Sequence, residues 1–124
     1  MIKGIGIDII EIERVEAAVK KYGEKFLRRV FTKREIEHCT SHKAYRYPEL
    51  AVRFAAKEAY SKALGTGIGG FGRRHTGITW REIEVINDQR GKPLLVIRGK
   101  VSKKAHVSLS HSQANAVASV YVEK

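Results

Sequence analysis

The chain carries the stretch RFAAKEAYSKAL at residues 53–64, followed directly by the glycine-rich run GTGIGG at residues 65–70. The first stretch is dense in strong helix formers, and a glycine just past its end is typical of a helix terminus. Residues four apart share one face of a helix, so Phe54, Glu58 and Lys62 lie together. The stretch therefore predicts a long central helix that ends at a loop with many free backbone N–H groups.

The face that carries Glu58 and Lys62 places a carboxylate and an ammonium one helical turn apart, beside that loop. Such a combination suits a metal-bound phosphate, because the carboxylate holds the cation while the lysine and the amides contact phosphate oxygens. The same spacing is also that of an ordinary ion pair on a surface helix. Both interpretations stay open on the evidence of this helix alone.

Composition limits the classes of function. The 124 residues are enough for a single domain over residues 1–124, and the 43% hydrophobic content excludes wholesale disorder. The chain has 24 Lys and Arg against 13 Asp and Glu, which gives a formal net charge of +11. This excess indicates an acidic partner, which is a nucleic acid, an anionic membrane, a polyphosphate ligand or an acidic protein.

One cysteine, Cys39, excludes an internal disulfide, and without a CxxC partner it predicts a partly buried, inert thiol. The N-terminus has no charged segment followed by an apolar one, and no apolar run approaches the length that spans a membrane. We therefore expect a soluble, cytoplasmic protein with no membrane partner.

Residues 2–12 predict a strand, because β-branched residues dominate them and no turn signal interrupts them. Apolar residues at both parities indicate that the strand is covered on both faces or lies at a subunit contact. Gly4 and Gly6 lie on one face of it and allow something to pack close to the backbone. Asp8 is costly within such a strand unless it is paired or binds a cation; the alternative is an Asp at the strand end that faces solvent.

Residues 11–22 change to a helical period. The basic residues off the apolar stripe and beyond Gly23 indicate either a docking surface or a plainly solvated face. Thr32 and Glu35 fit a capping box that opens a second helix to about Ser41. Pro48 then starts the long central helix.

The second half predicts strands. Residues 83–86 and 93–97 form a hairpin, and residues 107–112 and 116–122 form two further strands. One strand, three helical segments and then four strands predict an α+β fold, with an antiparallel sheet packed against the long central helix. The glycine-rich, basic segment 65–77 is expected to be mobile unless a ligand or partner orders it.

Three motifs occur in order along the chain: GIGIDI at residues 4–9, RFAAKEAYSKA at residues 53–63 and SLSHS at residues 108–112. Together they resemble the motifs of the holo-(acyl-carrier-protein) synthases, the small phosphopantetheinyl transferases, and the match spans the whole chain. The resemblance implies the fold of that family. It also implies transfer of the 4′-phosphopantetheine arm of coenzyme A to a serine of an apo acyl carrier protein, in fatty acid biosynthesis, with release of adenosine 3′,5′-bisphosphate.

The resemblance further implies a Mg²⁺ requirement and a homotrimer with active sites at the subunit interfaces. Asp8 and Glu58 match the family's metal-binding carboxylates, and Lys62 matches a phosphate contact that stabilises the leaving group. Glu58, directly or through a metal-bound water, is then the candidate base for the carrier serine. His111 matches the family's C-terminal histidine, either as a contact to the coenzyme phosphates or as a residue that fixes the local turn.

The remaining positions that the resemblance implies for coenzyme A fall in loops and at strand ends. Gly91-Lys92-Pro93 resembles the turn that lies against the nucleotide in the family. The positions assigned to coenzyme A are Gly67, Lys92, Pro93, Ser110, His111, Ser112, Arg46 and Lys62. Lys43, Arg46 and Arg53 are candidates for its 3′-phosphate, or else plain surface charges.

The charge excess fits this resemblance, because acyl carrier proteins are acidic and the family docks them through its first helix. The resemblance assigns this docking to Arg14, Lys21, Lys25 and Arg28. The loop at residues 69–76 is longer and more basic than a minimal member implies, so its contribution to either ligand stays open.

Two competing hypotheses come from other classes. A basic nucleic-acid-binding module is favoured by the net charge and by the aromatic and basic residues around Tyr45 and Tyr47. No known RNA- or DNA-binding signature is present, however, and two metal-type carboxylates would repel a phosphate backbone, so we expect no nucleic-acid partner. A purely structural homo-oligomer leaves Asp8 unexplained.

Overall fold

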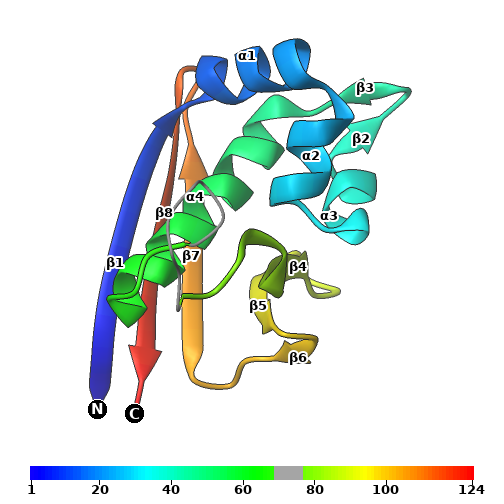
Figure 1. The fold of residues 1–124 in the computed structure, drawn as a ribbon. Coiled ribbons are helices and arrows are strands. Elements are labelled where there is room, and N and C mark those ends of the chain that lie inside the picture. The colour runs from blue at the N-terminus through cyan, green and yellow to red at the C-terminus, as the bar shows by residue number, and fades with distance from the viewer. Residues whose placement is uncertain (69–76) are drawn as a thin grey trace.

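The structure is a computed structural model that describes residues 1–68 and 77–124 (Figure 1). The helices are α1 (Ile12–Tyr22), α2 (Glu24–Val30), α3 (Lys33–His38) and α4 (Tyr47–Leu64), with a 3₁₀ turn η1 (Trp80–Glu82). The strands are β1 (Ile2–Glu11), β2 (Thr40–Ser41), β3 (Ala44–Tyr45), β4 (Ile83–Asn87), β5 (Pro93–Ile97), β6 (Lys100–Val101), β7 (Ala105–His111) and β8 (Asn115–Glu123).

The long helix α4 is the centre of the arrangement. An antiparallel sheet in the order β1–β8–β7 lies along one side of α4 (Figure 1). The short helices α1, α2 and α3 gather on the other side, toward the top of the view. A second antiparallel sheet, β4–β5–β6, packs against the same helix, because Ile83, Val85 and Leu95 share a buried cluster with Ala56 and Ala59. The structure confirms the predicted α+β fold around a long central helix.

The backbone of α4 comes very close to β1. A Cβ atom added to Gly4 would lie 2.0 Å from the carbonyl oxygen of Ala63, and one added to Gly6 would lie 1.8 Å from that of Ala59. No side chain fits in either place, which confirms that the two glycines form a face for close packing. Asp8 follows them on this inner face of the strand.

The outer face of β1 is apolar and open. Ile5, Ile7 and Ile9 are 66%, 61% and 67% exposed. The described residues thus cover β1 on one face only, so the expectation of cover on both faces is wrong for a single chain. A contact between subunits is the alternative that is left for this outer face.

Local sequence signals place the start of α3 and both ends of α4. Thr32 and Glu35 form the predicted capping box at the start of α3. Pro48 lies in the first turn of α4, and Gly65 ends that helix with a φ of 78°. Cys39 is fully buried rather than partly buried, and this burial raises the pKa of its thiol to about 11, which makes it inert.

Four short elements were missed, namely α2, β2, β3 and β6. Gly23, at a φ of 59°, separates α2 as a helix of its own, so residues 1–68 and 77–124 contain four α-helices where three were predicted. The helix predicted to reach Ser41 ends at His38, and Thr40–Ser41 instead pairs with Ala44–Tyr45. The two-residue strand β6 was also not predicted. Elements this short carry too few residues to show a period.

The glycine-rich segment falls mostly outside the described residues, which stop at 68 and resume at 77. The prediction of mobility and the open role of residues 69–76 therefore concern a part of the chain that the structure does not describe. On either side of it, Ile68 and Ile78 form a parallel bridge. None of the helices in the described ranges has the length and apolar character needed to cross a membrane.

Candidate active site

Asp8, Glu58 and Lys62 line one pocket of about 500 Å³. Asp8 comes from the inner face of β1, and the other two come from successive turns of α4. The Nζ atom of Lys62 donates hydrogen bonds to Asp8 Oδ1 at 2.9 Å and to the carbonyl oxygen of Ile7 at 3.0 Å. Residues 54 positions apart in the chain are thus in direct contact, as the predicted site requires.

The electrostatics of this pocket favour a cation. Burial raises the pKa of Glu58 above its usual range; the negative charge of Asp8 raises it further, and the ammonium of Lys62 opposes the shift. The Asp8 side chain is only 17% exposed. Two carboxylates held this close in a half-buried pocket repel each other, and a bound cation relieves that repulsion.

The donor set is small. Across residues 1–68 and 77–124 no group of three or more His, Cys, Asp or Glu side chains is arranged to hold a metal. A metal held by Asp8 and Glu58 therefore needs further oxygen ligands from a bound substrate or from water. Mg²⁺ is commonly bound in this way, through one or two carboxylates plus phosphate oxygens. The residues present fit that ion.

The same pocket has an apolar wall that we did not predict. Phe26 and Phe54 stack with their ring centroids 6.5 Å apart, and Val15 and Ala18 of α1 complete the wall. The helical spacing already placed Phe54 on the face of Glu58 and Lys62. Nothing in the spacing indicated Phe26, which arrives from α2. Arg14, predicted to dock a carrier protein, also lines this pocket and connects it to the outer surface of α1.

A second group of predicted residues lies elsewhere. Lys92, Pro93, Ser110 and His111 line a different pocket of about 430 Å³, and it shares no lining residue with the first. It lies beside β7, which forms the edge of the sheet opposite to β1. The structure thus brings the predicted site residues together in two groups and not in one.

At the end of β7, the side chains of the last motif make local contacts. The His111 Nδ1 atom lies 3.2 Å from the carbonyl oxygen of Ser112. The Ser112 hydroxyl accepts hydrogen bonds from the amides of Ala114 and Asn115. These contacts shape the β7–β8 turn, and the exposed ring of His111 keeps its Nε2 atom available for a ligand.

Arg53 is not a surface charge, so that alternative is wrong. It is 1% exposed, pairs with Glu49 at 2.9 Å and donates to Asn87 Oδ1 at 2.7 Å. Glu49 and Asn87 both line the second pocket, so Arg53 lies directly behind its wall. Arg46 is exposed and donates to the carbonyl oxygen of His38.

The last two predicted positions lie in exposed turns. Lys43 has a φ of 65° and belongs to the turn between β2 and β3. Gly67, with a φ of 72°, follows α4 and lines neither of the two pockets. Lys43, like Gly67, is not among the residues that line these two pockets.

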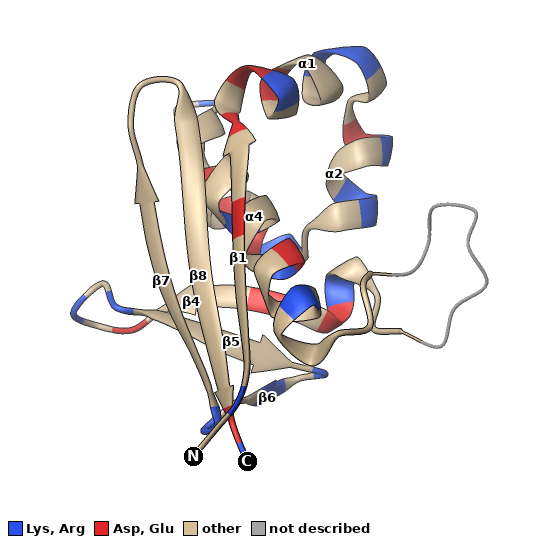
Figure 2. Ribbon diagram, turned by 90° about the vertical axis from the view of Figure 1, so that its left-hand side faces the viewer, with Lys and Arg blue, Asp and Glu red and all other residues tan. Residues whose placement is uncertain are grey.

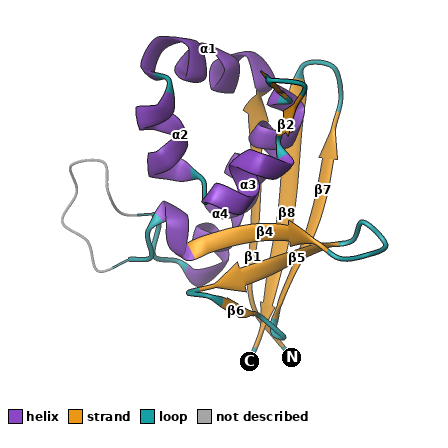
Figure 3. Cartoon of the chain, turned by 90° about the vertical axis from the view of Figure 1, so that its right-hand side faces the viewer, coloured by secondary structure: helices purple, strands orange, loops and turns teal. Residues whose placement is uncertain are grey.

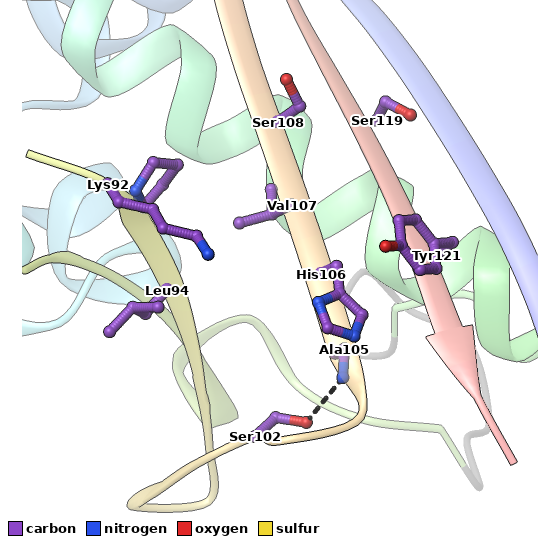
Figure 4. Close-up of a pocket in the computed structure, with 10 residues that line it drawn as sticks. Lys92, Leu94, Ser102, Ala105, His106, Val107, Ser108, Ser119 and Tyr121 are labelled. Carbon is purple, nitrogen blue, oxygen red and sulfur yellow. Dashed lines mark hydrogen bonds between the residues drawn. The ribbon is translucent and has the colours of Figure 1, made fainter.

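Lys92 and Pro93 also border a third pocket of about 400 Å³ (Figure 4). Its far wall is the outer face of β7 and β8, where the rings of His106 and Tyr121 stack 4.7 Å apart. Figure 4 shows the Lys92 side chain extending across this space toward β7. The predicted Lys92 is thus shared between two hollows, which sequence spacing could not reveal.

The four residues predicted for carrier docking, here called the basic surface, are all exposed. Arg14 and Lys21 lie on α1, and Lys25 and Arg28 lie on α2, where Figure 2 shows the basic residues along the two helices. Of these, Arg28 has a carboxylate partner on its own helix, Glu24 at 3.3 Å, with both side chains well exposed. Exposed pairs of this kind are worth little, so the surface stays available to an acidic partner.

Comparison with known proteins gives a consistent result. A family model of the 4′-phosphopantetheinyl transferase superfamily matches residues 4–121. The chain is 42% identical to a holo-(acyl-carrier-protein) synthase of Koribacter versatilis, with 99% of each chain covered. It is 43% identical to a Bacillus anthracis holo-(acyl-carrier-protein) synthase solved in complex with CoA (3′,5′-ADP), at a TM-score of 0.78, covering 100% of this chain and 98% of that one.

A second solved structure agrees. The Helicobacter pylori holo-(acyl-carrier-protein) synthase, in complex with coenzyme A, is 33% identical at a TM-score of 0.80, with 96% of this chain and 99% of that one covered.

Proposed function

The chain belongs to the 4′-phosphopantetheinyl transferase superfamily as an enzyme of its holo-(acyl-carrier-protein) synthase family, and we propose that it transfers the 4′-phosphopantetheine arm of coenzyme A to a serine of an apo acyl carrier protein. The observation that carries this proposal is the convergence of Asp8, Glu58 and Lys62 from β1 and α4 in one open pocket. The two solved relatives, one in complex with CoA (3′,5′-ADP) and the other with coenzyme A, support coenzyme A as the donor.

The proposed chemistry needs positioning and charge neutralisation more than a nucleophile of the enzyme. The carrier serine Oγ attacks the phosphorus that bears the pantetheine arm, and the bond from this phosphorus to the bridging oxygen breaks. Adenosine 3′,5′-bisphosphate leaves with that oxygen. Glu58 accepts the serine proton, directly or through one water. Lys62 neutralises charge on the leaving group.

Mg²⁺ is part of the same proposal. Asp8 and Glu58 would hold the ion. Their presence in one pocket supports this assignment, because it supplies two carboxylate ligands. When bound, the ion neutralises charge on the pyrophosphate and thereby makes the phosphorus easier to attack.

Coenzyme A would also use the second group of residues. Hydrogen-bond donors to the phosphate oxygens would come from Lys92, Ser110 and His111. Pro93 would offer an apolar surface to the adenine base. We further propose that Ser112, Arg46 and Gly67 contribute from the surrounding turns.

The two groups of site residues lie at opposite edges of one sheet. A homotrimer, in which the first group of one chain meets the second group of its neighbour, explains how both groups can serve one active site. The exposed isoleucines on the outer face of β1 support such a subunit contact. The basic surface on α1 and α2 would receive the acidic carrier protein beside the first pocket. Arg14 connects that surface to the pocket that holds Glu58.

The deciding experiment is intact-mass spectrometry of an apo acyl carrier protein incubated with this protein, coenzyme A and Mg²⁺. Parallel samples contain EDTA, Asp8→Ala or Glu58→Ala, and a matched control carries Glu13→Ala, an exposed carboxylate on α1 outside the pockets described above. We expect a gain of one phosphopantetheine mass that is lost in the first three samples and kept in the control. No gain on any carrier, with the protein folded, contradicts the proposed transfer.

A further inference from the structure

Lys57 is adjacent to Glu58 in α4, yet its side chain leads to a different part of the molecule. It is 0% exposed. Its ammonium donates to Glu35 Oε1 at 2.6 Å, to the carbonyl oxygen of Val30 at 2.7 Å and to that of Trp80 at 3.1 Å. An ammonium has three protons, so each one has an acceptor.

Glu35 extends this network. Its Oε1 also accepts from the backbone amide of Thr32 at 2.9 Å, and its Oε2 accepts from that of Val85 at 2.8 Å. The Glu35 side chain is 0% exposed, like that of Lys57. One buried ion pair therefore ties α4 to the end of α2, the start of α3, the turn η1 and the strand β4. Figure 3 shows α2, α3 and β4 on the same side of the molecule.

Val30 is the last residue of α2, whose final carbonyl groups have no partner within the helix. A positive charge at this end also suits the helix dipole. Lys57 therefore fixes the end of α2 to α4 by a directional contact. A second path runs through aromatic rings: the ammonium lies 5.4 Å from the Phe31 ring centroid, and Phe31 meets Phe26 edge-on at 6.2 Å.

The helix that Lys57 holds has two functional faces. Its exposed side carries Lys25 and Arg28 of the basic surface, and its inner side carries Phe26, part of the wall of the pocket that contains Glu58. The place of α2 thus sets how a partner on the basic surface stands relative to Glu58.

We propose that Lys57 is a positioning residue for the acyl carrier protein: it holds α2 at a fixed place relative to Glu58 and so aims the carrier serine at the catalytic pocket. This inference rests on the proposed function. It does not concern coenzyme A, whose second group of residues lies on β7 and the β4–β5 turn.

Stability alone does not require this ion pair. Replacing a buried ion pair with uncharged side chains of similar volume is often neutral or stabilising, because both charges had to leave water. What apolar side chains lack is direction: they fill the space without the hydrogen bond that Lys57 donates to Val30 at the end of α2 and without its bonds to Glu35 and Trp80, which hold that ammonium in place. Loss of the pair should therefore affect where α2 lies more than whether the chain folds.

The test is the double variant Lys57→Met with Glu35→Gln, which removes both charges at nearly constant volume and leaves no buried charge unpaired. The initial rate of carrier modification is measured against carrier concentration and against coenzyme A concentration. We expect the KM for the carrier to rise at least tenfold, while the KM for coenzyme A stays within twofold of its wild-type value.

A matched control separates positioning from a general loss of stability. Val122→Ala removes buried core volume at the far end of β8, away from α2 (Figure 1). At a comparable loss of thermal stability, it should leave the carrier KM unchanged. If the double variant fails to fold, Phe31→Leu takes its place, because it keeps the ion pair but loosens the contact to Phe26; it should raise the carrier KM at least threefold.

The outcomes are distinct. Absence of any product with the wild-type protein contradicts the proposed function itself. Product formation with an unchanged carrier KM in the folded double variant, or in Phe31→Leu, overturns the positioning role alone. A rise in carrier KM that Val122→Ala reproduces also overturns it, because the effect would then follow stability.

Discussion

Lys62 Nζ lies 2.9 Å from Asp8 Oδ1, and the helix and the strand that carry these residues approach so closely that no side chain fits between them at Gly4 or Gly6. The contact between the two charged groups therefore depends on two positions that carry no chemistry of their own. This relationship makes the glycines part of the site.

Gly6→Ala should separate the two halves of the first pocket. The new Cβ atom would lie 1.8 Å from the carbonyl oxygen of Ala59, so α4 must move away from β1. We expect a loss of stability of about 1–3 kcal/mol, as is usual for overpacking. Activity should fall more than tenfold, as Asp8 and Glu58 separate.

Gly4→Ala is the control for this prediction, because its clash is similar at 2.0 Å but lies two residues further from Asp8. Urea unfolding and carrier modification are measured on both variants. Equal losses of activity in the two would show that the glycines act through stability only.

Lys62→Met should lower kcat by a factor of about 10²–10³, the usual effect of losing a group that stabilises charge in the transition state. The fold should persist, because the Lys62 side chain is 52% exposed. Lys20→Met is a close control, since Lys20 forms an ion pair of similar kind with Glu16 on the surface of α1. Single-turnover rates check the prediction, and a normal rate in the Lys62 variant contradicts it.

Glu82 should contribute to stability in a pH-dependent way. Hydrogen bonds from the Thr79 amide and the Arg98 side chain lower its pKa from 4.5 to about 2. A lowered folded pKa means that the stabilisation is present above the unfolded value and is lost as the pH falls through the folded one. Its contribution at pH 7 should be about 1 kcal/mol, because solvent screens a side chain that is 36% exposed.

Thermal unfolding of the wild type and Glu82→Gln at pH 7 and at pH 3 tests this dependence. The difference between the two proteins should shrink to less than half at pH 3. A difference that is the same at both pH values would show that the carboxylate charge plays no part.

Cys39 should resist thiol reagents in the native protein at pH 8. The residue is 0% exposed, and its thiol pKa of about 11 leaves very little thiolate at that pH. Absorbance after addition of Ellman's reagent should rise only when denaturant is added, and the rise should correspond to one reacting cysteine per chain. Rapid reaction in native buffer is the result that disagrees.

Ile7→Glu should dissolve the proposed trimer without harming the fold. Ile7 is 61% exposed on the outer face of β1, so a charge there has no cost in an isolated chain. Light scattering after size exclusion should give a trimer for the wild type and a monomer for the variant, with activity lost in the latter. Tyr22→Glu, at a residue 56% exposed on α1, should leave the assembly intact.

Much of the fold was accessible from local signals. The capping box of Thr32 and Glu35, the start of α4 at Pro48 and the hairpin of β4 and β5 each depend on residues near one another in the chain. The pairing of Asp8 with the α4 face was also within reach, because a carboxylate inside an apolar strand needs a partner.

Other features depend on contacts that no local pattern encodes. Glu35 satisfied a capping box in the sequence, and nothing there revealed its buried contacts with Lys57 and Val85, 22 and 50 residues away. The division of the site residues into two groups follows from strand order, since β8 separates β1 from β7. Strand order is a property of the whole chain and cannot be read from the spacing of motifs.

β1 has a strict two-residue alternation, with Gly4, Gly6 and Asp8 toward α4 and Ile5, Ile7 and Ile9 away from it. A single residue inserted or deleted between Gly4 and Asp8 would turn the residues on one side of the change to the opposite face. Bulky isoleucines would then meet the helix backbone where no side chain fits, and the carboxylate would leave its pocket. Length changes in this strand should therefore be tolerated far less than most substitutions. Variants of this chain that stay active should keep the two-residue spacing of Gly4, Gly6 and Asp8 even where other residues of the strand are replaced.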